Sequence, residues 1–208
     1  MVEYDPKVFL VNSIDEAKRI ILTPEGIGTE ARWEIETPYL IDLIAEYCDP
    51  VSNKLVLDYG CGIGRLAKPL IDDFSCNVVG VDISSAMRAF ACAYTNSGQF
   101  LVGSPNILNW FENKFDFAIA VWTLQHCLNP DDDLDLIANT LQPRGRLFVV
   151  NNINRAVPVR DRQWAEDGID ILAKLDERFE RKIVGKLDPQ FSSEDLSSWT
   201  FYGVWQKR

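Results

Sequence analysis

Short apolar runs alternate with amphipathic segments along most of this chain. Between residues 54 and 150, runs rich in Val, Leu, Ile, Phe and Ala are bounded by turn-forming residues. Runs that are apolar throughout, rather than at every second position, are typical of strands buried on both faces of a parallel sheet. The pattern predicts strands at 54–58, 77–82, 99–103, 115–121 and 145–150, helices at about 64–73, 84–95 and 132–141, and a short turn near 105–111.

The first fifty residues are expected to be helical. After a short extended or frayed lead, Ser13 and Glu16 form a capping box that begins a helix at about 14–22. A second helix is predicted to begin near Thr37-Pro38, because proline is favoured at the first helical position, and to end at Asp49-Pro50. We interpret residues 1–50 as a helical cap or lid on the rest of the chain.

After Val150 the apolar pattern loosens. A helix is predicted at about 162–177, followed by two β-rich runs at 178–187 and 198–207. A loop joins these two runs, which favours an antiparallel pair that closes the sheet. The sequence contains no repeat, low-complexity segment or linker. The whole chain, 1–208, is therefore expected to be one domain, with its core at 51–208.

The first predicted strand runs into a turn with three glycines. Residues 54–65 read KLVLDYGCGIGR, and the second strand ends in Asp82, 24 residues after Asp58. Glycines allow a sharp turn and a close approach of the backbone to a ligand, and the N–H groups that open the next helix are unpaired donors. A carboxylate at the end of the second strand can accept hydrogen bonds from a ribose diol. The pattern therefore predicts a site for a nucleoside-containing cofactor.

Asp58 separates two kinds of nucleoside site. A dinucleotide places a doubly charged pyrophosphate against the glycine turn, and an acid that begins the turn would repel it. An acid at this position suits a ligand with a cationic amino group. A nicotinamide oxidoreductase is therefore disfavoured.

Three segments resemble the motifs of class I S-adenosylmethionine-dependent methyltransferases. Residues 58–64 resemble their first motif, and Asp82 their ribose-binding acid. Residues 115–126 (FDFAIAVWTLQH) and 141–150 (LQPRGRLFVV) are similar to their fourth-strand and fifth-strand motifs. The resemblance implies an α/β fold, namely a three-layer αβα sandwich. Its seven-stranded, mostly parallel sheet would have the order 3-2-1-4-5-7-6, with strand seven reversed.

The same resemblance implies S-adenosyl-L-methionine as cofactor and S-adenosyl-L-homocysteine as product. The glycine turn would hold the methionine group, Asp82 the ribose, and Ile83 and Met87 the adenine. The end of the fourth strand would lie beside the sulfur. Family members often carry an acid after strand three, and this chain has Ser104-Pro105-Asn106 there instead. The cofactor-binding residues implied in this way are Asp58, Tyr59, Gly60, Cys61, Gly62, Gly64, Asp82, Ile83, Met87, Ser104, Pro105, Asn106, Ala120, Val121 and Trp122.

Two further residues have a functional and a structural interpretation. His126 is the only histidine, and it can serve as a general base or as a structural residue at a helix start. Trp33 can close over the cofactor or pack in the core. The functional interpretation makes segment 23–36 a mobile lid, with Gly26 and Gly28 as hinges.

Composition and charge limit the kinds of partner and the cellular location that are expected. The net charge of −10 argues against a protein that grips a nucleic-acid backbone or an anionic membrane. No apolar stretch is long enough to cross a bilayer, and no signal peptide opens the chain. The five cysteines lack Cys-x-x-Cys spacing, so reduced thiols in a cytoplasm are expected. The run Asp131–Asp133 follows Pro130 and is interpreted as the acidic start of a helix; no metal site is expected.

The leading hypothesis is a methyltransferase that acts on a small molecule, because the chain has no added recognition domain. The alternative from another class is a non-catalytic cofactor-binding or interaction protein on the same fold. The methyl acceptor, its nucleophilic atom and the oligomeric state are left open by the sequence.

Overall fold

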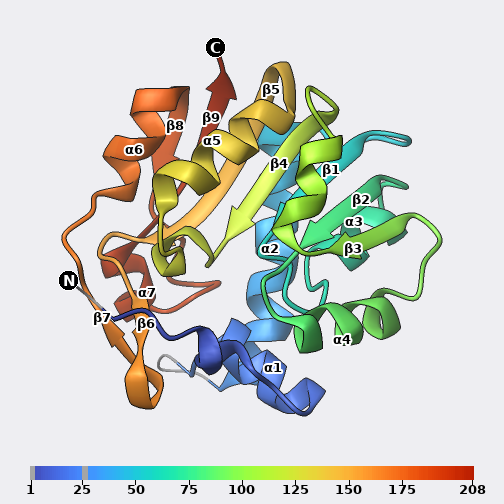
Figure 1. Cartoon of the computed structure of the whole chain (residues 1–208). Coiled ribbons are helices and arrows are strands. Elements are labelled where there is room, and N and C mark those ends of the chain that lie inside the picture. The colour runs from blue at the N-terminus through green and yellow to red at the C-terminus, as the bar shows by residue number, and fades with distance from the viewer. Residues whose placement is uncertain (1–2, 25–27) are drawn as a thin grey trace.

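The protein folds around one twisted sheet with helices on both faces (Figure 1). The structure, a computed structural model, describes residues 3–24 and 28–208. The strands of this sheet are β1 (Leu55–Tyr59), β2 (Asn77–Val81), β3 (Phe100–Gly103), β4 (Phe115–Val121), β5 (Leu141–Asn152), β8 (Phe179–Gly185) and β9 (Thr200–Lys207). Their order within the described residues is β3-β2-β1-β4-β5-β9-β8.

Strands β1 to β5 are parallel to one another, and β9 is antiparallel to both of its neighbours, β5 and β8. Two short strands, β6 (Val157–Val159) and β7 (Gln163–Ala165), pair only with each other within the described residues. Apart from the numbering that these two add, the order is the predicted 3-2-1-4-5-7-6 with one reversed strand. The predicted fold class is confirmed.

Each face of the sheet carries its own hydrophobic cluster. On one face, Leu134 and Ile137 of α5 (Pro130–Thr140) and Leu175 of α6 (Ile171–Arg178) pack on the strands. On the other face, the contacts come from α2 (Thr29–Cys48) and α3 (Ala67–Asp72). Helix α4 (Ser85–Thr95) packs beside β3. Side chains such as Leu57 and Ile119 are fully buried, which explains the continuous apolar runs in the sequence.

Helix α2 is longer than the sequence pattern predicts. It begins at Thr29, not near Thr37-Pro38, and carries Pro38 inside it. A proline removes one helical hydrogen bond and normally ends or kinks a helix. Here the preceding turns are held by a buried ion pair between Arg32 and Glu36, one helical turn apart. Glu36 also forms an ion pair with Arg65, which lies after the glycine turn. The predicted start was therefore wrong because this tertiary contact and the pair within the helix outweigh the local signal.

The N-terminal lead is also more ordered than expected. Ser13 caps α1 (Ile14–Ile21) by accepting a hydrogen bond from the Glu16 N–H, as the capping box predicts. Before it, the residues Pro6–Phe9 form a short 3-10 helix, capped by Asp5. This 3-10 helix replaces the extended lead that the pattern suggested.

The predicted helix at 162–177 was wrong in its first half. Residues 157–165 form the β6–β7 hairpin, whose turn places Asp161 and Arg162 in the left-handed region. Gly168 also has a positive φ, and α6 begins only after Asp170, whose side chain accepts a hydrogen bond from the Ala173 N–H. The two β-rich runs that follow are β8 and β9, and between them lies α7 (Glu194–Trp199), which the pattern did not predict.

No helix in the described residues is long and apolar enough to cross a membrane. Across the same residues, no group of three or more His, Cys, Asp or Glu side chains is placed to hold a metal ion.

Candidate cofactor and acceptor site

The glycine turn lies at the carboxyl end of β1, in the middle of the sheet. Gly60 has a φ of 77°, and a Cβ at this position would collide with the side chain of Thr123. The N–H groups of Gly60 and Cys61 donate to the carbonyl oxygen of Val81, 2.8 and 3.0 Å away. The turn is therefore tied to the end of β2, and only glycine fits its first position.

Asp82 joins the turn to the loop after β2. Its Oδ2 accepts a hydrogen bond from the Gly62 N–H at 3.0 Å, and its Oδ1 accepts one from the Ser84 N–H at 2.8 Å. Burial raises the pKa of this carboxyl, and the two backbone donors act in the opposite direction. A carboxylate fixed in this way has remaining lone pairs for the hydroxyls of a ligand.

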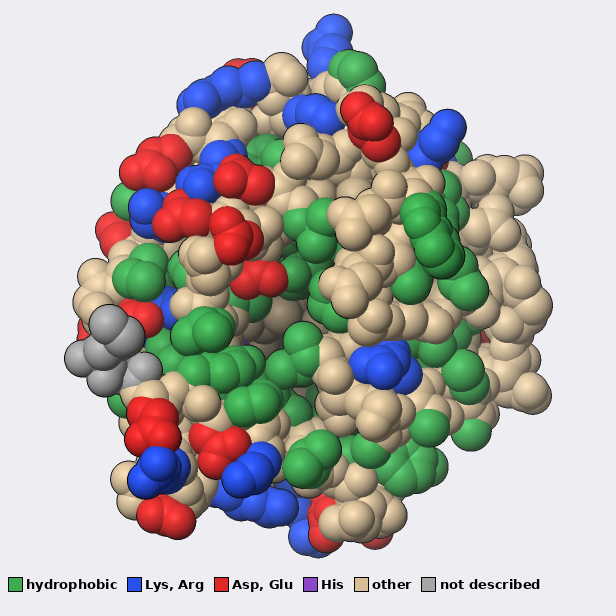
Figure 2. Space-filling view, viewed as in Figure 1, with side chains coloured by type: hydrophobic (Ala, Val, Ile, Leu, Met, Phe, Trp, Pro, Cys, Tyr) green, Lys and Arg blue, Asp and Glu red, His purple; other side chains and the backbone are tan. Residues whose placement is uncertain are grey.

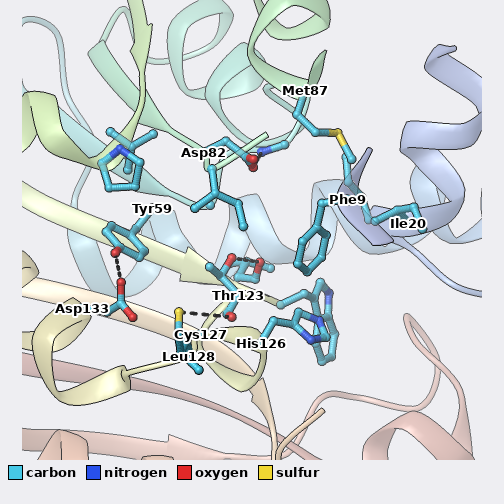
Figure 3. A pocket seen from close by; sticks show the side chains of 18 of the residues that line it. Phe9, Ile20, Tyr59, Asp82, Met87, Thr123, His126, Cys127, Leu128 and Asp133 are labelled. Carbon is cyan, nitrogen blue, oxygen red and sulfur yellow. Dashed lines mark hydrogen bonds between the residues drawn. The ribbon is translucent and has the colours of Figure 1, made fainter. Parts of the chain in front are cut away.

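A cavity of about 370 Å³ opens at the carboxyl ends of β1, β2 and β4. Figure 2 shows it as a hollow with hydrophobic side chains around it. In Figure 3, Phe9 and Ile20 lie at one end and the pair Tyr59–Asp133 at the other, with Asp82 between them. The lining residues are Tyr4, Phe9, Ile20, Ile21, Tyr59, Gly60, Gly62, Val81, Asp82, Ile83, Met87, Pro105, Val121, Trp122, Thr123, His126, Cys127, Leu128, Asn129, Asp132 and Asp133.

A second cavity, of about 30 Å³, lies behind the glycine turn. It shares part of its wall with the larger one, including Gly60, Gly62 and Trp122. Asp58 and Cys61 line only this smaller cavity, together with Arg65 and Leu66. The two cavities therefore form neighbouring parts of one site.

Most of the predicted cofactor residues line one of these two cavities. Five do not: Gly64, Ser104, Asn106, Ala120 and Trp33. The Trp33 ring instead packs edge-on against Tyr94 and beneath the Lys18 ammonium. Of the predicted hinges, Gly26 lies outside the described residues, and Gly28 is the N-cap of α2.

Several residues that line the larger cavity were not predicted from the sequence. Tyr4 and Phe9 come from the N-terminal lead, and Ile20 and Ile21 from α1. The dipeptide Asp5-Pro6 is a helix-start signal that could have drawn attention to this segment. Its docking, however, depends on distant contacts, such as the 2.9 Å hydrogen bond from the Asp5 N–H to the Pro158 carbonyl oxygen. The other missed residues of the larger cavity are Val81, the last residue of β2, and six residues that follow β4: Thr123, Cys127, Leu128, Asn129, Asp132 and Asp133.

His126 lies in the cavity wall as a neutral imidazole. Its Nδ1 is 2.6 Å from the Ala156 carbonyl oxygen, which can only accept, so Nδ1 carries the proton. Desolvation by burial lowers the pKa of His126 to about 4. The Nε2 atom therefore keeps its lone pair at neutral pH, and the side-chain nitrogen of Gln125 lies 3.3 Å from it. The ring also packs against Phe9 and Trp164, with centroid distances of 5.8 and 4.6 Å.

At the other end of the cavity, Tyr59 donates a short hydrogen bond to Asp133. Burial raises the pKa of Tyr59 well above its usual value and also raises that of Asp133. The Cys127 thiol donates to the Thr123 carbonyl oxygen at 3.7 Å, and burial raises its pKa too. The tyrosine and the cysteine are therefore protonated at neutral pH.

Trp122, after the last residue of β4, borders both cavities. It adopts the left-handed region with a φ of 56°, which is strained for a bulky residue. Its indole N–H donates to Oε1 of the buried Glu36 at 2.9 Å. The same carboxylate bonds to Arg32 and Arg65, and this network fixes α2 against the site.

The charge of the larger cavity is one-sided. Among the described residues that line it, Asp82, Asp132 and Asp133 are acidic and none is Lys or Arg. Asp131 and Asp135, the other acids of α5, do not line this cavity. They form ion pairs with Arg178 of α6. The acidic start of α5 is therefore divided between a helix–helix contact and the cavity wall.

A family model described as a methyltransferase domain matches residues 57–149. This segment contains the glycine turn, Asp82 and the strands β2 to β4, around which the site is built. The match is a similarity to a methyltransferase domain over less than half of the chain, and the sheet order is the one that the family resemblance implies. The family resemblance seen in the sequence is confirmed.

Individual relatives are distant. The O-methyltransferase rstn1 of Aspergillus nomiae is 28% identical over 124 residues, which cover 57% of this chain and 55% of that protein. Phosphoethanolamine N-methyltransferase 2 of Haemonchus contortus, solved with S-adenosyl-L-methionine, has a TM-score of 0.64 at 15% identity and covers 92% of this chain and 56% of its own. The [4+2]-cyclase SpnF has a TM-score of 0.66 at 20% identity, covering 81% of this chain and 80% of its own.

The matches cover between 26% and 55% of the first curated relatives' own length. At identities of 15% and 20%, the structural similarities establish the fold alone. A cyclase among them illustrates that this fold carries more than one chemistry.

Proposed function

We propose that this protein binds S-adenosyl-L-methionine and transfers its methyl group to a small molecule in the larger cavity. The observation that carries the proposal is that cofactor-motif residues and residues outside the motifs line one cavity. Asp82, Ile83 and Met87 lie in its wall with Phe9 and His126. A cofactor on the first group would leave the second group for an acceptor.

The size and charge of the cavity limit the acceptor. A volume of about 370 Å³ lies at the small end of ligand pockets, which favours a metabolite over a macromolecule. A carboxylate or phosphate on the acceptor would face acidic side chains without a cationic partner from the described lining residues. We therefore infer that the acceptor has no anionic group and is largely apolar where it meets Phe9 and Ile20.

Methyl transfer requires mainly positioning by the protein. Bound S-adenosyl-L-methionine supplies an activated methyl carbon, and its sulfur leaves as the thioether of S-adenosyl-L-homocysteine. The chain's contribution is to hold the acceptor atom in line with that carbon and to exclude water. Nε2 of His126 has one lone pair, and the side-chain nitrogen of Gln125 lies 3.3 Å from it. An O–H or N–H group of the acceptor would be oriented by His126 if it took the place of Gln125 on this lone pair. The low pKa of His126 makes it a weak base, so we assign it a positioning role.

The first test is cofactor binding. S-adenosyl-L-methionine and S-adenosyl-L-homocysteine should raise the melting temperature by mass action, whereas NAD and NADP should not. Stabilisation by a dinucleotide alone would refute the proposal.

The second test is turnover. Transfer of label from methyl-labelled cofactor should be screened against pools of neutral and cationic metabolites and against matched pools of carboxylates and phosphates. Label should enter the first set only. Cofactor binding without transfer to any pool would favour the non-catalytic alternative.

A further inference from the structure

His126 is the titratable side chain that packs against Phe9 in the wall of the larger cavity, and both of its nitrogens already have protein partners. Its Nδ1 lies 2.6 Å from the Ala156 carbonyl oxygen, and its Nε2 lies 3.3 Å from the side-chain nitrogen of Gln125. The Gln125 amide is fixed in this orientation, because its Oε1 accepts a hydrogen bond from the Asn152 N–H at 3.0 Å. The lone pair on Nε2 is therefore occupied by the protein.

The turn that carries His126 is held from behind. Arg155, whose side chain is fully buried, donates from Nη1 to the Leu124 carbonyl oxygen at 2.8 Å and from Nη2 to that of Cys127 at 2.5 Å. Its charge is paired with Asp167 at 3.0 Å. An acceptor that passed a proton to His126 would have to displace the partner on Nε2 from a fixed turn, and burial lowers the pKa of the imidazole to about 4. His126 is therefore poorly suited to be a general base.

The carboxylates of the described cavity wall are grouped away from Phe9. Figure 3 shows Asp133 with Tyr59 at the opposite end and Asp82 between the two ends. Asp132 belongs to the same helical turn as Asp133. Tyr59 donates to Asp133, and both oxygens of Asp82 accept backbone N–H groups. A general base must lie within hydrogen-bond reach of the proton that it takes. At the Phe9 end, the carboxylates therefore act through their charge and not as bases.

The charge of these carboxylates reaches the lead that carries Phe9. Tyr4 lies on the same lead and lines the cavity. Burial is the main cause that raises the pKa of Tyr4 to about 12, and nearby groups that include Asp133 and Asp82 raise it further, whereas Arg155 opposes them. The described lining residues include no Lys or Arg. The cavity therefore favours a cationic ligand group over an anionic one.

The bonds that change in methyl transfer differ between acceptors. In transfer to an O–H group, an oxygen electron pair forms the new C–O bond, the C–S pair passes to sulfur, and the proton must go to a base. In transfer to a ring nitrogen without a proton, the lone pair forms the N–C bond, the C–S pair again passes to sulfur, and the positive charge moves from sulfur to the ring. The second reaction needs no base, and it leaves a cation in an acidic cavity. An aliphatic amine is protonated at neutral pH, as lysine is, and would need a base as well.

The walls at the Phe9 end suit a flat apolar ring. Phe9 and Ile20 lie there (Figure 3), and the His126 ring meets Phe9 at 63° with centroids 5.8 Å apart. Aromatic faces also attract a cation. We propose that the methyl acceptor is an aromatic heterocycle with a pyridine-type ring nitrogen, and that the product is the N-methylated ring cation; this rests on the proposed function. An O–H or N–H group elsewhere on the ring can still take the place of Gln125 on His126.

The first test reads the charge of the product. The full chain is incubated with methyl-labelled S-adenosyl-L-methionine and either pyridine-type heterocycles (pyridine, quinoline and isoquinoline) or comparison compounds (1-naphthol, 2-naphthol and piperidine). The products are passed over a cation exchanger at about pH 12, where N-methylated ring cations keep their charge and ethers and aliphatic amines are neutral. Label should enter a heterocycle, as a retained cation, at least tenfold faster than it enters any comparison compound.

Faster labelling of a comparison compound would overturn the proposal. If none of the named compounds is labelled, the same separation and mass spectrometry are applied to the labelled metabolite pools. A retained product with an N-methylated heteroaromatic ring supports the proposal, and any other labelled product overturns it. Label in no pool, from a protein that binds S-adenosyl-L-methionine, would refute the proposed function instead.

Two variants of α5 test the charge of the cavity wall. Asp133→Asn removes a lining carboxylate and keeps an oxygen for Tyr59. Asp131→Asn is the matched control, because Asp131 lies on the same turn but bonds to Arg178 and is not part of the described cavity wall. With saturating S-adenosyl-L-methionine, Asp133→Asn should lower kcat/KM for the labelled heterocycle at least threefold, and Asp131→Asn should leave it unchanged. Equal values in the two folded variants would overturn the proposal; if Asp133→Asn does not fold, the charge of the wild-type product decides.

Discussion

Cofactor affinity should rise with pH because of Asp58. Burial is the main cause that raises the pKa of this carboxyl to about 7 in the free protein; nearby Asp82 raises it further, and Arg65 opposes the shift. The usual value for Asp is about 3.9. A cofactor ammonium bound to Asp58 requires the carboxylate and lowers the pKa again. Binding therefore releases a proton at neutral pH, and affinity is lost as the pH falls through about 7.

The size of the effect follows from the fraction of free protein that has Asp58 ionised. With a pKa of about 7, this fraction is roughly one in eleven at pH 6 and about three in four at pH 7.5. The dissociation constant should therefore fall about eightfold over this range, or by about 1.2 kcal/mol. The same shift means that Asp58 destabilises the free fold as the pH rises from about 4 to 7, so thermal stabilisation by ligand should grow with pH.

Calorimetry with S-adenosyl-L-homocysteine is the suitable assay, because this ligand lacks the sulfonium charge that perturbs the neighbouring ammonium. Repeating the titration in buffers of different ionisation enthalpy counts the released protons. Asp58→Asn should bind more weakly at pH 7.5 and lose the pH dependence. An affinity that is constant between pH 6 and 7.5 in the wild type, or an equal slope in Asp58→Asn, would refute the reasoning.

Three further predictions concern the larger cavity. Asp82→Ala should weaken S-adenosyl-L-methionine binding more than tenfold by calorimetry, because charged hydrogen bonds contribute roughly 1.5–3 kcal/mol each. His126→Phe should lower turnover at least tenfold with cofactor affinity nearly unchanged, because it keeps the ring contacts with Phe9 but removes Nε2. Gly60→Ala should lower the free energy of unfolding by roughly 1–2 kcal/mol or more through its positive φ and the contact with Thr123.

Each of these predictions has a control. Circular dichroism checks that Asp82→Ala is folded, and unchanged affinity in the folded variant would mean that the ribose site lies elsewhere. Wild-type turnover in His126→Phe would leave the imidazole a packing role alone. Gly28→Ala is the matched control for Gly60→Ala, since a Cβ at Gly28 has no neighbour within 4 Å; equal stability of the two variants would contradict the steric argument.

The strands of the core could be predicted because local pattern and burial agree there. Apart from Asp58 and Asp116, the runs at β1 and β4 are apolar, and both faces of these strands are covered. The start of α2 could not be predicted, because Pro38 signals a helix start while Arg32 and Glu36 extend the helix through a contact with Arg65. A contact between residues 29 positions apart leaves no periodic trace in the sequence.

The residues of the candidate site also fall into those that the sequence could predict and those that it could not. Residues on the glycine turn and after β2 could be assigned because their spacing along the chain fixes their place in space. Phe9 could not, because its position depends on the docking of the N-terminal lead against the β6–β7 hairpin.

The docking of the lead on the hairpin has a consequence for how this protein can change. Glu3 and Phe9 contact Arg160 and Trp164, and all four residues lie outside the segment 57–149 that carries the family match. Tyr4 and Phe9 of the lead line the larger cavity, and the hairpin holds the lead in place without lining that cavity itself. Exchanging the lead and the hairpin together between related proteins should change which acceptor is preferred. The sheet and the predicted cofactor-binding residues would stay unchanged, so acceptor preference could be engineered separately from cofactor binding.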